Sequence, residues 1–440
     1  MSYICFTFFE LLQRRKRDWQ AQIGKLPDYR RKPFFNDNAK MVLIVEGGCL
    51  KTAYGAGFLK GLDDSFGVEY RDTKSILHLV DEVIVISGGA PVALASASGK
   101  LDKAPDIFKI LTSTQFFSPY RMAKSELMPQ RFAGKSKTPP IDLGFAMKSL
   151  ADMGMNFNAF NELGINISYL TTHAETGEQI AIRNPEGDLI TFAPRASMTI
   201  PFMAGDPLDH NGTFVHDGGF SHDPSGYNYA VETLGASHVL CTSNNHVSHI
   251  ERDEGIVYRI ICDELKDRPG ALDAYTRCHL RLRQIHDDAA DGTIHSSIHN
   301  GNLISNRGGL TLRLETTFPE EHSTFDRLEL RAAELLRRIQ TGYQNAELIA
   351  GHYLHGEPLP ELRLRPYTTL EEQEDLFRAI TSMGASAFWS ASAAVTETTV
   401  AATKFGVNLG VNMATIGMRN LPFWAGGSSP PTPPPGSSPQ

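Results

Sequence analysis

The sequence predicts an α/β fold in which a mostly parallel central sheet is sandwiched by helices, with a helical addition at the C-terminal side. Short apolar runs rich in β-branched residues alternate with longer runs of helical pattern. Strands that alternate with helices pair in parallel and are covered on both faces. The expected strands are Met41–Glu46, Val83–Ile86, Asn166–Thr171, Thr213–His216 and His238–Thr242. The expected helices are Ala53–Asp64, Pro91–Ser98, Ala104–Leu111, Phe145–Met153 and Tyr229–Leu234.

The second half of the chain is more helical. Helices are expected at Leu265–Asp288 and Phe325–His355, with a strand at Leu310–Glu315 between them. Earlier in the chain, Gln179–Arg183 and Asp188–Phe192 flank a turn sequence, Asn-Pro-Glu-Gly, that predicts a β-hairpin.

Composition divides the 440 residues into four parts. These are an N-terminal helical and basic extension (1–39), the main domain (40–355), a helical region rich in small residues (356–426) and a disordered tail rich in Pro and Ser (427–440). Within the main domain, Thr112–Asp142 has little periodicity and is a candidate lid. Residues 384–418 could form a membrane-inserting or oligomerising hairpin, or only a close-packed appendage.

A glycine turn and a serine turn follow two of the predicted strands. The first is Glu46-Gly47-Gly48-Cys49-Leu50-Lys51, and the second is Val85-Ile86-Ser87-Gly88-Gly89-Ala90. Ligands bind at the carboxyl ends of strands in such sheets. A serine on a sharp strand-to-helix turn is exposed, and it becomes a nucleophile when a neighbouring base takes its proton.

A third motif, Asp217-Gly218-Gly219, follows another predicted strand and supplies the base. In the chemistry that these motifs predict, Ser87 attacks an ester carbonyl and Asp217 accepts its proton. The backbone N–H groups of Gly47, Gly48 and Cys49 then form the oxyanion hole, helped by the positive end of the following helix.

These motifs resemble those of the patatin-like phospholipases and acyl hydrolases. Members carry a Gly-Gly-Gly-x-Arg/Lys-Gly loop, a Gly-x-Ser-x-Gly elbow and an Asp-Gly-Gly/Ala motif, and they use a Ser–Asp dyad without histidine. The matching segments are Gly47–Thr52, Val85–Gly89 and Asp217–Gly219, and Arg195–Phe202 is similar to an Ala-Ser-x-x-x-Pro stretch ahead of the aspartate. The resemblance covers roughly residues 40 to 350. It implies a serine acyl hydrolase that cleaves phospholipid or lysophospholipid esters with no cofactor and no metal.

Three positions depart from the family pattern. Cys49 replaces the third glycine, Thr52 the glycine after the basic residue, and Val85 the first glycine of the elbow. A left-handed backbone at Cys49 costs about 1–2 kcal/mol. Val85 needs room that a small residue such as Ala93 could provide. The alternative function is therefore a catalytically weak or inactive lipid-binding protein of the same family.

Each motif also has a plainer explanation when it is taken alone. The glycine turn could bind a dinucleotide, but its glycines do not follow G-x-G-x-x-G. Ser87 could be only a helix cap, and Asp217-Gly218-Gly219 only a turn. Lys51 could contact a substrate phosphate or be a surface helix residue.

Three histidines near the third motif could suggest a metal site. His210, His216 and His222 are separated by six residues each, which matches no common ligand spacing, so solvated loop histidines are expected instead.

The charge and cysteine content restrict the partners and the compartment. A formal net charge of −8 argues against general nucleic-acid binding. Five scattered cysteines with no C-x-x-C pair are typical of reduced thiols in a cytoplasmic environment. The oligomeric state is left open.

The N-terminus does not have the order of a secretory signal, because its basic cluster follows the short apolar stretch. This segment could lie on an anionic membrane as a peripheral contact, or it could be an amphipathic helix packed on the domain.

Overall fold

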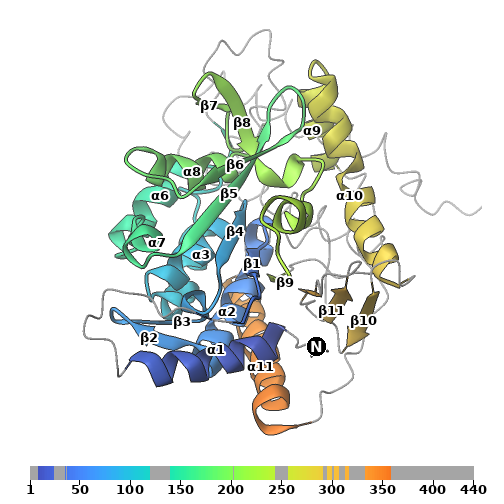
Figure 1. The fold of residues 1–440 in the computed structure, drawn as a ribbon. Coiled ribbons are helices and arrows are strands. Elements are labelled where there is room, and N and C mark those ends of the chain that lie inside the picture. Colours follow the sequence, from blue (N-terminus) through green and yellow to red (C-terminus); the bar gives the residue numbers. More distant parts are fainter. Residues whose placement is uncertain are drawn as a thin grey trace, which may run out of the picture.

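The computed structural model describes residues 8–23, 35, 37–118, 139–201, 203–242, 256–290, 295–299, 302–306, 313–316 and 332–357. Its centre is a mixed, mostly parallel sheet flanked by helices (Figure 1). The strand order is β12-β9-β1-β4-β5-β8-β7, and β6 pairs with β5. The predicted α/β class, a mostly parallel sheet between helices, is confirmed, and the predicted helical C-terminal addition lies almost entirely outside the described residues.

The strands of this sheet are β1 (Met41–Val45), β4 (Glu82–Ile86), β5 (Asn166–His173), β6 (Gln179–Arg183), β7 (Leu208–His210), β8 (Thr213–Asp217), β9 (His238–Thr242) and β12 (Arg313–Thr316). From β12 to β5 all neighbours are parallel, whereas β6 and β8 pair antiparallel with β5. Two hairpins lie outside it, one of β2 (Val68–Tyr70) with β3 (Thr73–Ser75) and one of β10 (His295–His299) with β11 (Asn302–Asn306).

The described helices are α1 (Phe8–Ile23), α2 (Thr52–Phe66), α3 (Gly89–Ala97), α4 (Ala104–Leu111), α6 (Leu143–Asp152), α7 (Ala159–Glu162), α8 (Leu189–Ser197), α9 (Ile256–Leu265), α10 (Pro269–Ala290) and α11 (Ala332–His355). Single helical turns occupy Cys49–Lys51, Ile76–His78, Leu101–Lys103 and Gly218–Phe220. The predicted helix at Tyr229–Leu234 is a π-helix, Tyr229–Thr233. None of the helices described here is both long and apolar enough to cross a membrane.

Alternate residues of β1 enter two different cores, as expected for a strand covered on both faces. Met41, Leu43 and Val45 join the large cluster that the helices cover, and Val42 and Ile44 join a smaller cluster on the other face. Every residue of β1 and β4 is buried. Burial of this kind fixes the ends of both strands, where the two motif turns begin.

Helix α1 packs on the domain, which agrees with the second alternative for the N-terminal segment. Phe8, Phe9 and Trp19 are buried in the large core. Arg15, from the basic cluster, is also buried, and its guanidinium pairs with Asp37 at 2.7 Å and with Asp81 at 3.0 Å. These contacts tie α1 to the segment just before β1 and to the turn that leads into β4.

The predicted hairpin around residues 184–187 is wrong. Gln179–Arg183 is a strand, but it pairs with β5, and the second predicted strand is the start of helix α8. The helix buries Ala193, Ala196 and Ser197 against the domain, and this packing overrides the strand-like local sequence.

Several predictions fall on residues outside the described part of the chain. These are most of the candidate lid, the small-residue region at 384–418 and the Pro/Ser tail. The division into four domains stays a prediction.

Candidate active site

The glycine turn and the serine turn lie side by side because β1 and β4 are parallel neighbours. Val45 pairs in register with Val85, so the two strands end at the same edge of the sheet. A Cβ atom built on Gly47 would lie 2.6 Å from Ser87 Cβ and 3.3 Å from Ser87 Oγ. A side chain at position 47 would therefore collide with the serine, and only glycine permits this approach.

Ser87 lies at the elbow between β4 and α3. Its φ is 51°, in the left-handed region that non-glycine residues rarely adopt. The N-cap residue of α3 is Gly88, and the Ser87 hydroxyl instead donates a hydrogen bond to a carboxylate on another strand. The explanation of Ser87 as a simple helix cap is therefore wrong.

That carboxylate belongs to Asp217, the last residue of β8. Ser87 Oγ donates to Asp217 Oδ2 at 2.5 Å across 130 positions of sequence. The other carboxylate oxygen, Oδ1, accepts the N–H of Gly219 at 2.8 Å. Asp217 is 1% exposed and Ser87 is 7% exposed, so the pair lies in a largely water-free environment.

Two backbone contacts fix Asp217 in place. The Asp217 N–H donates to Thr199 O at 2.9 Å, and Thr172 Oγ1 donates to Asp217 O at 2.8 Å. Asp217 therefore has little freedom to turn away from Ser87.

The loop from Gly47 to Lys51 brings several backbone groups towards the serine. Gly48 has a φ of 131° and Cys49 a φ of 53°, so the left-handed backbone considered for Cys49 is present. Thr52 stabilises this turn, because its hydroxyl donates to Cys49 O at 2.6 Å. Helix α2 begins at Thr52 and α3 at Gly89, and both place their positive ends near the loop and the elbow.

The remaining departure, Val85, and the basic residue Lys51 are both buried. Val85 and Ala93 are fully buried in the same core cluster, which is consistent with a small residue facing the valine. Lys51 is only 3% exposed, so its alternative as a surface residue is wrong. Its contact with a substrate phosphate stays a prediction.

The three histidines occupy three different environments. His222 is exposed and His210 half-buried, whereas His216 is fully buried, so the prediction of a solvated loop residue is wrong for His216. The ring of Phe220 covers it at 5.6 Å, and burial lowers the pKa of His216 to about 4. Among the described residues no group of three or more His, Cys, Asp or Glu side chains is arranged to hold a metal ion.

The four cysteines that the structure describes are all free thiols. Cys241 is buried in β9, where burial raises the pKa of its thiol. Cys49 is half-buried in the glycine loop.

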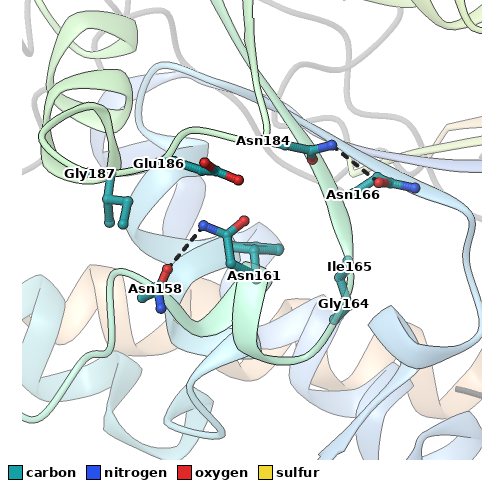
Figure 2. A pocket seen from close by; sticks show the side chains of 10 residues that line it. Asn158, Asn161, Gly164, Ile165, Asn166, Asn184, Glu186 and Gly187 are labelled. Atoms are coloured by element: carbon teal, nitrogen blue, oxygen red, sulfur yellow. Dashed lines mark hydrogen bonds between the residues drawn. The ribbon is translucent and has the colours of Figure 1, made fainter. Parts of the chain in front are cut away.

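A shallow pocket of about 590 Å³ lies elsewhere on the domain (Figure 2). Its lining is rich in asparagine, and Asn161 donates to Asn158 while Asn184 donates to Asn166. Asn166 begins β5, whereas Thr171 of the same strand pairs with Asp217. The two residues are five positions apart along the strand, or about 16 Å. The pocket is thus distinct from the Ser87–Asp217 pair.

Sequence reasoning did not assign a role to Ser197 or Thr172. Ser197 lies in the stretch that resembles Ala-Ser-x-x-x-Pro, and Thr172 lies just beyond the predicted end of its strand. Neither contact has a local pattern, because the partners are distant in sequence. The positions of Ser87 and Asp217 therefore depend on these tertiary contacts as well as on the motifs.

The fold and this edge define a class, an α/β protein with a buried serine–carboxylate pair beside a glycine loop. Residues 43–230 match the family model of the patatin-like phospholipases. The resemblance predicted from the motifs is therefore confirmed over these residues, which make up less than half of the chain.

No curated protein matches the chain. Among solved structures, VipD from Legionella pneumophila is similar to this chain, with 12% sequence identity and a TM-score of 0.33. The aligned region covers 81% of this chain and 76% of the VipD chain.

Proposed function

We propose that this chain is a serine acyl hydrolase that cleaves fatty-acyl esters through a Ser87–Asp217 dyad. The observation that carries the proposal is the 2.5 Å hydrogen bond from Ser87 Oγ to Asp217 Oδ2. A carboxylate at this distance can take the serine proton as the oxygen attacks, which is the role of a general base.

In the first half of the reaction, Ser87 Oγ attacks the ester carbonyl and its proton passes to Asp217. The tetrahedral intermediate collapses, the alcohol leaves with that proton, and an acyl-serine remains. In the second half, water attacks the acyl carbon as Asp217 takes its proton, the bond to Ser87 Oγ breaks to release the fatty acid, and the proton passes from Asp217 back to Ser87 Oγ. Both halves place negative charge on the former carbonyl oxygen.

We assign the stabilisation of that negative charge to the backbone N–H groups of Gly47, Gly48 and Cys49. The close approach of Gly47 to Ser87 puts this loop beside the attacked carbon. The starts of α2 and α3 add positive potential from aligned peptide dipoles. The Ser87 N–H is not assigned to the hole, because it donates to Ser197 Oγ at 3.0 Å.

The substrate class follows from the family match, which supports hydrolysis of lipid esters. We assign phospholipids and lysophospholipids as substrates, in the manner of a phospholipase A or lysophospholipase. Lys51 is assigned as a contact for the substrate phosphate.

The test is a comparison of Ser87→Ala with a matched control, Ser96→Ala. Ser96 is also buried and also donates to a carboxylate, Asp63 Oδ2, at 3.1 Å. Turnover of a chromogenic fatty-acyl ester and release of fatty acid from phosphatidylcholine vesicles should fall by at least about 10³-fold in Ser87→Ala. Ser96→Ala should stay within about threefold of the wild type.

One outcome would decide against the proposal, and another would call for a folding control. If the wild type is silent on every ester but binds vesicles as well as Ser87→Ala does, the lipid-binding alternative holds. If Ser87→Ala and Ser96→Ala lose activity equally, misfolding could explain both losses. Circular dichroism of each variant distinguishes misfolding from the loss of the nucleophile.

A further inference from the structure

The side chain of Ser197 bridges the serine elbow and strand β5. Its hydroxyl oxygen accepts the N–H of Ser87 at 3.0 Å, and the same hydroxyl donates to Leu170 O at 2.7 Å. Ile86 and Leu170 are the last paired residues of β4 and β5, so the bridge lies one residue beyond the end of the ladder. Ser197 is fully buried.

This bridge supports a strained backbone. Ser87 has a left-handed φ of 51°, a conformation that persists only where surrounding contacts hold it. Its N–H has left the β ladder and lies where water is largely excluded, so it needs an acceptor. Within the described residues, Ser197 Oγ is the acceptor of that N–H.

The turn that carries Ser197 also holds the base. Thr199, two residues later, accepts the N–H of Asp217 through its carbonyl oxygen at 2.9 Å. The end of helix α8 and the two residues after it therefore contact both members of the pair, one through a side chain and one through the backbone. A shift of this turn would change the distance between Ser87 Oγ and Asp217 Oδ2.

We propose that Ser197 is a positioning residue for the nucleophile, which keeps the Ser87 hydroxyl within hydrogen-bonding reach of Asp217. This proposal rests on the proposed function, because it assigns a role in the same reaction. Ser197 does not touch the reacting atoms. It acts through the Ser87 N–H, so its loss should lower kcat and leave KM nearly unchanged.

The chain offers a matched control in Ser168. This serine is also fully buried, lies on β5 two residues before Leu170, and donates to Glu82 Oε1 at 3.0 Å. It has no contact with either member of the dyad among the described residues. Its hydroxyl also lies 3.3 Å from Tyr229 OH, so Ser168→Ala, like Ser197→Ala, removes two hydrogen bonds of a buried serine, but without the link to Ser87.

The experiment uses the full chain with Ser197→Ala, Ser197→Thr and Ser168→Ala. Misplacement of a nucleophile costs about 10²-fold, so kcat of Ser197→Ala on a fatty-acyl ester should fall by about that factor, with KM within threefold. Ser197→Thr keeps the hydroxyl and should recover at least tenfold of the loss. Ser168→Ala should keep kcat within threefold.

A second measurement does not depend on turnover. Hydrogen exchange of the peptide that contains Ser87 should become at least tenfold faster in Ser197→Ala and stay unchanged in Ser168→Ala. The exchange measurement needs only Ser197→Ala and Ser168→Ala. It therefore still tests the proposal if Ser197→Thr does not fold.

The outcomes separate this inference from the proposed function. If Ser87→Ala is silent while Ser197→Ala keeps kcat within threefold, the positioning role is wrong and the dyad stands. If the wild type turns over no ester, the proposed function fails, and unchanged exchange at Ser87 in Ser197→Ala would then overturn the positioning contact as well. Equal losses in Ser197→Ala and Ser168→Ala would show a general effect of burial, and the inference would fall.

Discussion

Two buried aspartates of this domain, Asp217 and Asp63, accept similar sets of hydrogen bonds. Asp217 accepts a serine hydroxyl and the Gly219 N–H, at 2.5 and 2.8 Å. Asp63 accepts the hydroxyls of Ser75 and Ser96 and the N–H of Ile76, at 3.0, 3.1 and 2.7 Å. Judged by residue type and burial alone, the two sites are alike.

The backbone around the serines separates them. Ser96 lies inside helix α3, and Ser75 ends β3 in an extended conformation with a φ of −155°. Ser87 has a left-handed backbone, two helices begin beside it, and Gly47 approaches it closely enough to exclude a side chain. A buried Ser–Asp hydrogen bond is therefore common structural chemistry, and the turn around the serine makes one of these two pairs suited to attack a carbonyl.

The largest expected difference between the two aspartates is in turnover. Asp217→Asn removes the proposed base and should lower kcat/KM on a fatty-acyl ester by about 10³-fold. Asp63→Asn keeps an acceptor for the Ile76 N–H and should change kcat/KM by less than about threefold. Steady-state kinetics of both variants at pH 7.5 measure the contrast. A fall of equal size in Asp63→Asn would show that burial and not the elbow distinguishes the sites.

The second expected difference is in the pH dependence of stability. Burial raises the pKa of Asp63 to about 7, against the hydrogen bonds from Ile76, Ser75 and Ser96, which lower it. The folded state therefore binds this proton more tightly than the unfolded state does. The stabilisation is fully present below about pH 4 and is lost as pH rises through about 7.

Between pH 5 and pH 8 this loss amounts to about 3 kcal/mol of unfolding free energy. Asp63→Asn removes the titrating group. Between pH 5 and pH 8 the unfolding free energy of the variant should therefore fall by about 3 kcal/mol less than that of the wild type. Urea denaturation at the two pH values tests this for wild type and variant. Parallel pH profiles for the two proteins would contradict the assignment.

The third prediction tests the approach of the glycine loop to the elbow. Gly47→Ala places a Cβ atom 2.6 Å from Ser87 Cβ and 3.0 Å from Ile86 O, so the loop or the elbow must move. Misplacement of this size should lower kcat by about 10²-fold. Gly144→Ala is the control, since among the described residues its Cβ would meet only Asp142 Oδ1, at 3.3 Å. Labelling of Ser87 by a fluorophosphonate, read by intact mass, should slow in Gly47→Ala alone.

The sequence could predict the strands that carry the site and the order of its motifs. The β-branched runs at β1 and β4 are buried on both faces, and such runs have a strong local pattern. The contacts that hold the site in shape could not be predicted. Ser197 reaches Ser87 over 110 positions, and His216 is buried because Phe220 covers it. Such contacts depend on tertiary packing, and for the same reason the local sequence predicts a strand at Asp188–Phe192, where helix α8 begins.

The smallest expected effect concerns the strain that the glycine loop carries at Cys49. Its φ of 53° is one that glycine adopts readily, and a non-glycine residue there costs about 1–2 kcal/mol. Glycine also gives the unfolded chain more freedom, which offsets part of the gain. Cys49→Gly should therefore raise the free energy of unfolding by about 1 kcal/mol.

Cys49→Ala is the control, because it removes the thiol and keeps the strained backbone. Thr52 donates to the backbone oxygen of residue 49, so this bond survives in both variants. Urea denaturation should place Cys49→Gly above both Cys49→Ala and the wild type. The N–H assigned to the oxyanion hole is also kept, so kcat of Cys49→Gly should stay within about threefold of the wild type. Equal stability of the glycine and alanine variants would mean that the loop holds this conformation without cost, and the cysteine would then be no obstacle to the chemistry at Ser87.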